Sequence, residues 1–391
     1  MGDNKPSRIY HSPPDQTGSE GDSIKEVLAS NWIAPVGPHL LEFERVIESF
    51  SECSRALATN SCTAALHLGL ELLNVGPEDI VLLPSHSFIA SAHAVSYCRA
   101  EPVFIDSESV SGNMDPDLLV KAIQSLDQEG ALSRVKAIMV VHAYGWPAEM
   151  DRIIEISKSY GIPLIEDAAE SLGAKWRGKS TGTFGQFGAY SFNGNKIITT
   201  SGGGALLCPD EVSYAHALFL ATQAKEPAPD GMQGRVGYNY RLSNVLAALG
   251  TAQIKTMEQR MDQRRANRDR YLSYFSGWTE EMSVQFTNGW SHGQPNYWMT
   301  NVFFKKERWR STVENALEEW NIECRRIWKP IHLMASYSAS RFYSLREAGS
   351  VAQDLFELGT SLPSGSSLSE PDWKRIFHAL DQAKHEIERS L

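Results

Sequence analysis

Residues 182–204 read GTFGQFGAYSFNGNKIITTSGGG, and they govern the interpretation of the whole chain. An apolar segment at residues 189–192 is followed by a Gly- and Asn-rich turn that carries a single lysine, Lys196. Glycine lets the backbone approach a ligand closely, and a nearly charge-free surrounding favours an uncharged amine. Both conditions suit a lysine that attacks a carbonyl group, while an ordinary loop lysine is the alternative.

Short apolar segments surround this stretch and alternate with helical patterns. Segments of this length, bounded by Gly, Pro and Asp, are typical of strands buried on both faces of a mainly parallel α/β sheet. Ligands of such sheets bind at the carboxyl ends of the strands, so we expect the active site there. The expected strands are residues 80–83, 103–105, 137–141, 163–165, 189–192 and 205–207, with helices at residues 63–73 and 150–160.

The two ends of the chain follow other patterns. Residues 1–22 are rich in Pro, Ser, Gly and Asp, which predicts an arm before a first helix at residues 23–31. Residues 243–272 predict one long helix, and Ser369 followed by Pro371 predicts the N-cap of a last helix. We therefore expect an N-terminal arm and helix (1–30), a large α/β domain (31–255), and a linking helix with a small C-terminal α+β domain (256–391).

Arginines are frequent in the second half of the long helical pattern, where they alternate with Glu258, Asp262 and Asp269. Such alternation predicts a solvated helix face rather than a patch that binds nucleic acid. The arginines are Arg260, Arg264, Arg265, Arg268 and Arg270.

Composition excludes several classes of protein. The 391 residues, 42% of them hydrophobic, are enough for a large core, and the formal charge of −10 argues against nucleic-acid and anionic-membrane partners. The five cysteines form no C-x-x-C pair, so neither a disulfide framework nor a metal site is predicted. The longest apolar runs fall far short of the ~18 residues of a membrane span. We expect a cytoplasmic protein that acts on a small molecule.

Two further segments carry candidate chemistry. In ATNSCTAALHLGLEL, Cys62 and Thr63 open an apolar helix whose first N–H groups suit a phosphate, with an ordinary N-cap as the alternative. In IPLIEDAAESLGA, a strand delivers Asp167, a carboxylate that could hold a proton on a heterocyclic nitrogen, while Glu166 is interpreted as a solvated loop acid. The glycines at 182, 185 and 188 do not match the dinucleotide fingerprint, which disfavours a nicotinamide oxidoreductase.

These three segments, with five others in the same order, closely resemble the sugar aminotransferases of the DegT/DnrJ/EryC1/StrS family. The resemblance covers nearly the whole chain and implies the aspartate-aminotransferase (type I PLP) fold, with a mostly parallel mixed sheet in the large, PLP-binding domain and a smaller C-terminal α+β domain. It also implies pyridoxal 5′-phosphate as cofactor, with pyridoxamine 5′-phosphate as the intermediate form. The other five segments are SNWIAPVGP, PSHSFIASAHAV, GYNYRLSNVLAALG, IWKPIH and LPSG.

The resemblance implies two catalytic residues. Lys196 would form a Schiff base with the cofactor and later move a proton, and Asp167 would keep the pyridine nitrogen protonated. Glu170 stands where many relatives carry Gln, near the phenolic oxygen of the cofactor. An ionised Glu there would be repelled, so a protonated side chain and one turned aside both remain open.

The other cofactor-binding residues follow from the same resemblance. Phe88 would stack on the cofactor ring, with a core position as its alternative, and Ser191 would assist Cys62 and Thr63 in holding the phosphate. Asn239 would reach the phosphate of the neighbouring subunit's cofactor, which implies a homodimer with shared active sites.

A lysine at position 196, rather than the His of relatives that remove a 3-hydroxyl, favours transamination. The resemblance implies transfer of an amino group from L-glutamate, which leaves as 2-oxoglutarate, to the 4-keto group of a UDP-2-acetamido-2,6-dideoxy-4-keto-hexose, as in enzymes of bacillosamine type. Amination of a dTDP-3-keto or GDP-4-keto sugar, or a non-catalytic nucleotide-sugar sensor, are the alternatives.

A pocket for the nucleotide sugar is implied as well. A cation and aromatic rings suit a diphosphate and a base or sugar ring, although Trp328 and His332 could equally pack between domains. The residues that would line this pocket are Asn31, Trp32, Ile33, Ala34, Arg325, Trp328 and His332.

Overall fold

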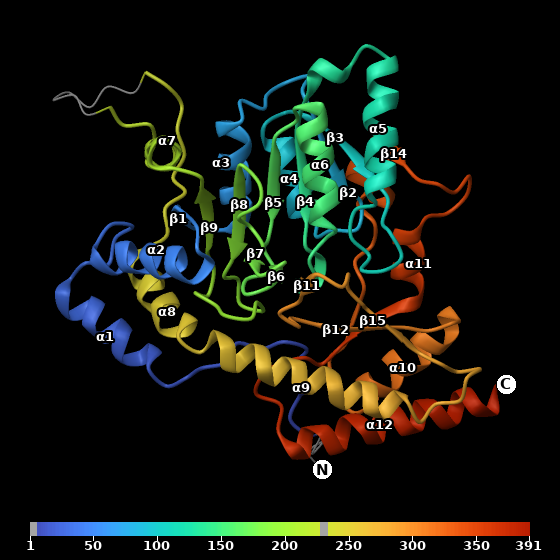
Figure 1. Cartoon of the computed structure of the whole chain (residues 1–391). Coiled ribbons are helices and arrows are strands. Elements are labelled where there is room, and N and C mark those ends of the chain that lie inside the picture. Colours follow the sequence, from blue (N-terminus) through green and yellow to red (C-terminus); the bar gives the residue numbers. More distant parts are fainter. Residues whose placement is uncertain (1–5, 227–233) are drawn as a thin grey trace.

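A computed structural model describes residues 6–226 and 234–391, so residues 1–5 of the expected arm lie outside the described part. Its main feature is an eight-stranded mixed sheet (Figure 1). Every strand predicted from the sequence lies in this sheet, which confirms the predicted fold class. In spatial order the strands are β1 (Arg55–Thr59), β9 (Gly204–Cys208), β8 (Phe187–Ser191), β5 (Leu164–Asp167), β4 (Val135–Val141), β2 (Ile80–Pro84), β3 (Glu101–Ile105) and β14 (Phe342–Tyr343).

Strand β9 alone in this sheet runs antiparallel to its neighbours β1 and β8, whereas the successive pairs from β8 to β14 are parallel. Parallel strands therefore end together, and the carboxyl ends of β4, β5 and β8 meet at one edge of the sheet. This arrangement brings the segments after those strands into one region.

Helices cover both faces of the sheet. Val81 and Leu83 of β2 pack in the same apolar cluster as residues of α3, α4 and α7, whereas Ile80 and Leu82 pack with residues of α5 and α6. Burial on both faces explains why the strands are continuously apolar in sequence. The helices are α3 (Cys62–Leu72), α4 (Ala90–Tyr97), α5 (Pro116–Gln128), α6 (Met150–Tyr160) and α7 (Glu211–Ala221).

The expected single helix at residues 243–272 is wrong. The chain forms α8 (Asn244–Ile254) and α9 (Met257–Phe275), separated at Lys255 and Thr256. No Gly or Pro marks this break, so the sequence carries no local signal for it. Helix α8 contacts α1 (Glu20–Ser30) and α2 (Pro38–Ser51), and α9 extends along the base of the molecule (Figure 1).

The predicted solvated face of α9 is also wrong for two of its arginines. Arg260 and Arg264 are 3% and 1% exposed. Arg260 donates to the carbonyl oxygens of Asp15 and Ile197, and Arg264 donates to that of Trp298 at 2.6 Å. The exposed Arg265 and Arg270 lie in the same alternating charge pattern as these two buried arginines. The pattern therefore does not distinguish a guanidinium that binds backbone carbonyls from one that faces solvent.

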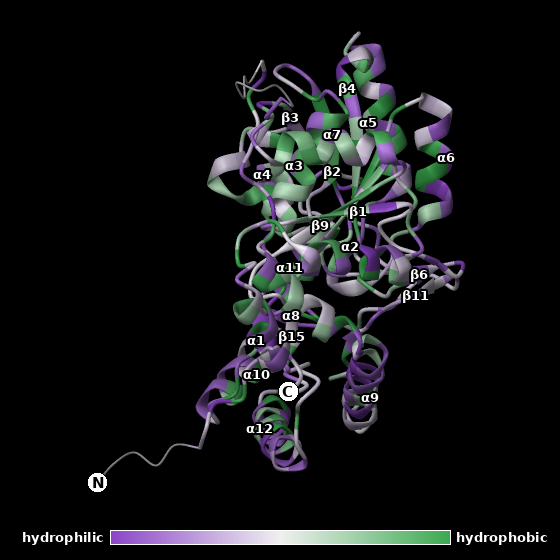
Figure 2. Cartoon of the chain, turned by 90° about the vertical axis from the view of Figure 1, so that its left-hand side faces the viewer, coloured by the Kyte–Doolittle hydropathy of each residue, from purple (hydrophilic) through white to green (hydrophobic). Residues whose placement is uncertain are grey.

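The C-terminal part builds a second, antiparallel sheet. Apolar residues of α9, α10 and α12 pack against it, together with Ile9 of the N-terminal arm. Figure 2 shows α9 and α12 with long hydrophilic stretches, whereas the strands of the large sheet are mainly hydrophobic. The order is β10 (Gln285–Phe286), β12 (Thr300–Phe303), β15 (Gly359–Leu362) and β13 (Arg325–Arg326), and the helices are α10 (Glu307–Glu319), α11 (Val351–Leu358) and α12 (Glu370–Arg389).

Strand β14 belongs to the large sheet although it lies within residues 256–391. A part of the C-terminal segment thus returns to the large α/β body. Ser369 caps α12 as predicted, with a capping box to Asp372. The remaining elements are the small sheet β11 (Gly293–Gln294), β6 (Lys175–Trp176) and β7 (Lys179–Ser180), and 3₁₀ turns at Leu132–Arg134, Ala143–Gly145, Ile331–Leu333 and Ala335–Tyr337. Within the described ranges, no helix combines the length and apolar character needed to cross a membrane.

Candidate active site

A cavity of about 380 Å³ opens where β4, β5 and β8 end. Most of the site residues expected from the sequence line this cavity. They come from separate segments spread between residues 62 and 328 of the chain. Those predicted residues that line it are Cys62, Thr63, Phe88, Asp167, Glu170, Ser191, Lys196, Arg325 and Trp328.

Lys196 lies in the turn after β8, with 12% of its side chain exposed. Its Nζ donates to Glu170 Oε1 at 2.9 Å and lies 4.1 Å from the ring centroid of Trp298. The amine is therefore enclosed between a carboxylate and an aromatic face. Trp298 was not predicted, and its indole N–H donates to the carbonyl oxygen of Asn195, next to the lysine.

Asp167 is the last residue of β5 and is 5% exposed. Its carboxylate accepts from Ser91 Oγ at 2.6 Å and from the Ala169 N–H at 3.2 Å. Burial raises the pKa of Asp167, and the bond from Ser91 acts in the opposite direction. A buried acid of this kind is stabilised in its ionised form by a cation placed beside it in the cavity.

Glu170 has its carboxylate turned toward Lys196. Its Oε2 accepts from the Tyr144 N–H at 2.7 Å, and only 4% of the side chain is exposed. Burial raises the pKa of Glu170, whereas the charge of Lys196 lowers it. The two hydrogen bonds fix this orientation.

The start of α3, where the sequence predicts a phosphate site, lies at the cavity. Ser61 Oγ accepts from the Ala64 N–H at 3.1 Å, so it caps one of the first N–H groups of the helix. Cys62 and Thr63 line the cavity beside it, and the positive end of the helix dipole faces the same space. A Cβ at Gly204 would lie 2.4 Å from the Cys62 nitrogen, so only glycine lets β9 approach this helix start.

Aromatic rings form the opposite wall. Phe88 is 57% exposed even though it lines the cavity, so it is not the core residue of the alternative interpretation. Trp328 lies 6.2 Å from Phe88 between ring centroids and stacks on Tyr144 at 4.1 Å. The backbone N–H of Trp328 donates to the Tyr144 hydroxyl at 3.1 Å, which holds the Tyr144 side chain beside this segment.

This donor set fits pyridoxal phosphate. A helix start would hold its phosphate, Asp167 its pyridine nitrogen, Phe88 a face of its ring and Lys196 its aldehyde. The fit rests on four different groups converging on one cavity.

Several predicted residues do not line the cavity of this chain. Residues 31–34 are exposed, and the Trp32 carbonyl accepts from Asn244 Nδ2 at 2.7 Å, which holds them on α8. Asn239 is exposed, and its carbonyl accepts from Asn60, itself a cavity residue.

His332 is the clearest correction. Its ring stacks on Phe342 at 3.6 Å between centroids, and its Nδ1 lies 2.6 Å from Ser85 Oγ. The interdomain-packing alternative therefore describes His332.

Glu166 is fully buried, so its interpretation as a solvated loop acid is wrong. It accepts from the backbone N–H groups of Gly182, Phe184 and Gly185, and its Oε2 lies 3.0 Å from His142 Nε2. The carboxylate thus fixes the turn before β8, the strand that leads to Lys196.

Comparisons with known proteins agree with this geometry. The model of the DegT/DnrJ/EryC1/StrS aminotransferase family matches residues 14–381. EpsN of Bacillus subtilis, named as a pyridoxal phosphate-dependent aminotransferase, is 42% identical over 384 residues, or 97% of each chain. The GDP-perosamine synthase of Caulobacter vibrioides is 35% identical over 96% of this chain and 98% of its own.

Solved structures show the same fold. A DegT DnrJ EryC1 StrS aminotransferase from Brucella abortus matches with a TM-score of 0.85 and 28% identity, covering 93% of this chain and 94% of the other. The family expected from the sequence is thereby confirmed, as are the aminotransferase activity and the pyridoxal phosphate cofactor that go with it. The chain belongs to the DegT/DnrJ/EryC1/StrS aminotransferase family.

Proposed function

We propose that this aminotransferase moves the amino group of L-glutamate to the 4-keto group of a nucleotide-linked deoxy sugar, with UDP-2-acetamido-2,6-dideoxy-4-keto-hexose as the substrate. The observation that carries transamination is the lysine itself. Lys196 Nζ lies in the cavity, 2.9 Å from Glu170 Oε1, where a proton can pass between an amine and a carboxylate.

Lys196 and Glu170 have different roles in proton transfer. When bound, the cofactor carries the amino group and withdraws charge from the substrate carbon that loses a proton. Lys196 Nζ takes up that proton and delivers it again. Glu170 Oε1 accepts a hydrogen bond from the same nitrogen and balances its charge while it is protonated.

Asp167 and the aromatic wall set the orientation. The Asp167 carboxylate, held by Ser91, pairs with the protonated ring nitrogen, and Phe88 fixes the ring plane. Trp298 covers the amine of Lys196 and excludes water from it. Arg325 at the mouth of the cavity supplies a cation for the diphosphate of the nucleotide.

The proposed enzyme is a homodimer with shared sites. Residues 31–34 are held on α8, but the side chains of Trp32 and Ile33 remain 51% and 50% exposed. Asn239 is exposed as well. Exposed large apolar side chains of this kind are suited to contact with a second subunit. In this proposal these residues and Asn239 complete the cavity of the partner subunit. The five free cysteines agree with a reducing compartment, and we place the enzyme in the cytoplasm.

A second candidate substrate is a GDP-4-keto sugar. It is favoured by the 35% and 33% identity to the GDP-perosamine synthases of Caulobacter vibrioides and Escherichia coli O157:H7. The experiment that separates the two candidates incubates the holoenzyme with L-glutamate and each keto-sugar nucleotide. The expected result is 2-oxoglutarate and a 4-amino sugar from the UDP sugar. Turnover of the GDP sugar alone would replace the first candidate, and no turnover of either would contradict both.

A further inference from the structure

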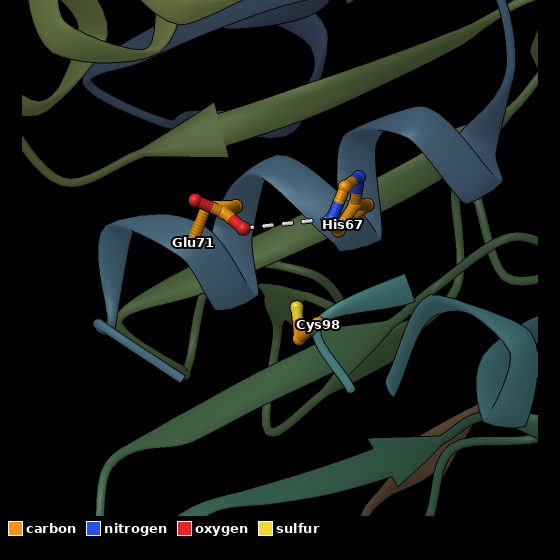
Figure 3. Close-up of side chains that lie close together, drawn as sticks. All are labelled: His67, Glu71 and Cys98. Carbon is orange, nitrogen blue, oxygen red and sulfur yellow. Dashed lines mark ion pairs between the residues drawn. The ribbon is translucent and has the colours of Figure 1, made fainter. Parts of the chain in front are cut away.

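A second group of side chains lies on α3, away from the mouth of the active site. His67 and Glu71 are one helical turn apart on α3, and Cys98 follows the last residue of α4. Figure 3 shows the sulfur of Cys98 directed toward the helix surface that carries His67 and Glu71. Their ligand atoms all lie within 4.8 Å of one another.

The imidazole of His67 is oriented for a ligand. The side chain is 5% exposed, and its Nδ1 lies 3.1 Å from the hydroxyl of Tyr240. When Nδ1–H donates to that hydroxyl, Nε2 carries a lone pair directed at Glu71 and Cys98.

Nε2 of His67 has no hydrogen-bond partner among the described residues, although it is buried. The nearest carboxylate oxygen, Glu71 Oε1, is 3.7 Å away, which is too long for a hydrogen bond. In the tautomer that carries its proton on Nδ1, the lone pair of Nε2 faces a carboxylate oxygen with no proton between them. A buried polar atom of this kind calls for a partner such as a water or an ion.

Glu71 and Cys98 are oriented consistently with a cation between them. Glu71 Oε2 faces outward, 3.7 Å from Arg235 Nη2, which leaves Oε1 directed inward. Cys98 is 4% exposed and forms no disulfide. An ordinary thiol is mostly protonated at neutral pH, and a bound cation replaces that proton.

We propose that His67 Nε2, Glu71 Oε1 and Cys98 Sγ bind a zinc ion. A nitrogen and an oxygen donor in a tetrahedral zinc site lie about 3.3–3.5 Å apart, so the 3.7 Å between His67 Nε2 and Glu71 Oε1 has to shorten by only about 0.3 Å. A sulfur lies about 3.6 Å from the nitrogen and oxygen donors of such a site, so Cys98 Sγ has to approach them by at most about 1.2 Å, and a water takes the fourth position. A nitrogen, an oxygen and a sulfur donor together favour zinc over calcium or magnesium.

Binding forms a zinc–sulfur bond and releases the thiol proton of Cys98 to the solvent. No electron is transferred. Tyr240 acts as the partner that holds the other ring nitrogen of the metal-binding histidine. The ion would tie the middle of α3 to the end of α4, and α3 also carries the expected phosphate site at its start. The site therefore stabilises the helix on which the cofactor phosphate rests.

The test is calorimetric titration of the holoenzyme with Zn²⁺ in a non-chelating buffer. The expected result is one equivalent bound per subunit with micromolar or tighter affinity, together with proton release. Cys98→Ser and Glu71→Gln should each weaken binding at least tenfold. Cys53→Ser, which changes a cysteine outside the cluster, is the matched control and should bind as the wild type does. Equal affinity in Cys98→Ser would overturn the proposal.

A second measurement needs no variant. Zinc X-ray absorption on the wild-type holoenzyme loaded with one equivalent should show one sulfur and several nitrogen or oxygen neighbours. A shell of nitrogen and oxygen alone, or no retention of zinc after dialysis, would overturn the proposal even if the Cys98 variant failed to fold.

Discussion

Asp167 and Glu170 are two acids that burial makes costly in the ionised form, and both line the cavity. Lys196 compensates Glu170 directly through the 2.9 Å contact. Among the described residues, the hydrogen bonds to the Asp167 carboxylate come from the Ser91 hydroxyl and the backbone N–H of Ala169. The site is thus prepared for a further cation beside Asp167, which the protonated ring nitrogen of the cofactor provides.

Asp167→Asn should make the apoenzyme more stable at pH 8 and the holoenzyme less active. Because burial raises the folded-state pKa of Asp167 above its unfolded value, the wild-type apoenzyme loses stability as pH rises through that folded pKa. The variant has no such loss, so its apoenzyme should melt at a higher temperature than the wild type at pH 8 and at a similar temperature in strong acid. Its kcat should fall on the order of 100-fold or more, because the charge opposite the ring nitrogen is gone.

Thermal melts of both apoenzymes at several pH values measure the change in stability. Steady-state kinetics of the holoenzymes measure the change in kcat. A variant that is less stable than the wild type at pH 8, or fully active, would show that Asp167 does not have this role.

Ser91→Ala should weaken cofactor binding. Ser91 Oγ donates to Asp167 Oδ2 at 2.6 Å and holds the pKa of the acid down. Without it a larger fraction of Asp167 is protonated, so the affinity for pyridoxal phosphate should drop about tenfold, as expected for loss of a hydrogen bond to a charged group. The loss should grow as the pH is lowered.

Fluorescence titration of the apoenzyme with the cofactor measures this affinity. Ser96→Ala is the matched control on the same helix, since Ser96 bonds to Ala92 and Tyr337 and not to Asp167. Equal effects of the two changes would contradict the explanation.

The sequence singles out residues that line the cavity where a side chain sits in a distinctive segment. Lys196, Asp167 and the start of α3 are of this kind. Trp298 escaped prediction because it comes from a segment more than 100 residues after the lysine that it covers. Glu166 was misjudged because its partners are backbone N–H groups of a turn, which no side-chain pattern reveals.

At the scale of helices and strands, burial decided what the sequence could reveal. The predicted strand segments are continuously apolar, whereas β1, β12, β15 and the two-residue strands were not predicted. The first strand, RALAT, contains only one large apolar residue, so periodicity does not separate it from a loop. The separation of α8 from α9 likewise depends on tertiary contacts, since no helix-breaking residue marks it.

Ser369→Ala should destabilise the C-terminal helix without affecting catalysis. Ser369 and Asp372 form a capping box at the start of α12, and removal of such a cap costs about 1 kcal/mol. Chemical denaturation should therefore show a lower midpoint at unchanged kcat and KM. An unchanged midpoint would mean that α12 unfolds separately from the transition that is measured.

In the whole molecule, the cavity of a single chain already contains Lys196, Asp167 and the start of α3. Asn239 and residues 31–34 are exposed and do not line it. Sequence resemblance predicted the fold across nearly the full length because the characteristic segments occur in order along the chain. The contacts of the N-terminal arm could not be predicted. Ile9 packs in the core of the C-terminal part and pairs with Ile322, a contact across more than 300 residues.

The shared-site dimer predicts complementation between two inactive variants. Lys196→Ala lacks the lysine, and Asn239→Ala lacks the side chain that we assign to the partner subunit's site. If equal amounts unfold and refold together, half of the dimers are mixed and each has one intact site, so about a quarter of wild-type activity should return. Variants refolded separately are the control. Absence of recovery in the mixture would place Asn239 in the site of its own subunit.

The central claim is that Lys196 binds the cofactor covalently and moves the proton of the reaction. The most direct measurement treats the cofactor-saturated enzyme with borohydride, digests it and identifies the modified peptide by mass spectrometry. The account predicts a stable pyridoxyl adduct on Lys196, absent from Lys196→Ala along with all turnover. An adduct on another lysine, or none at all from active enzyme, would contradict it.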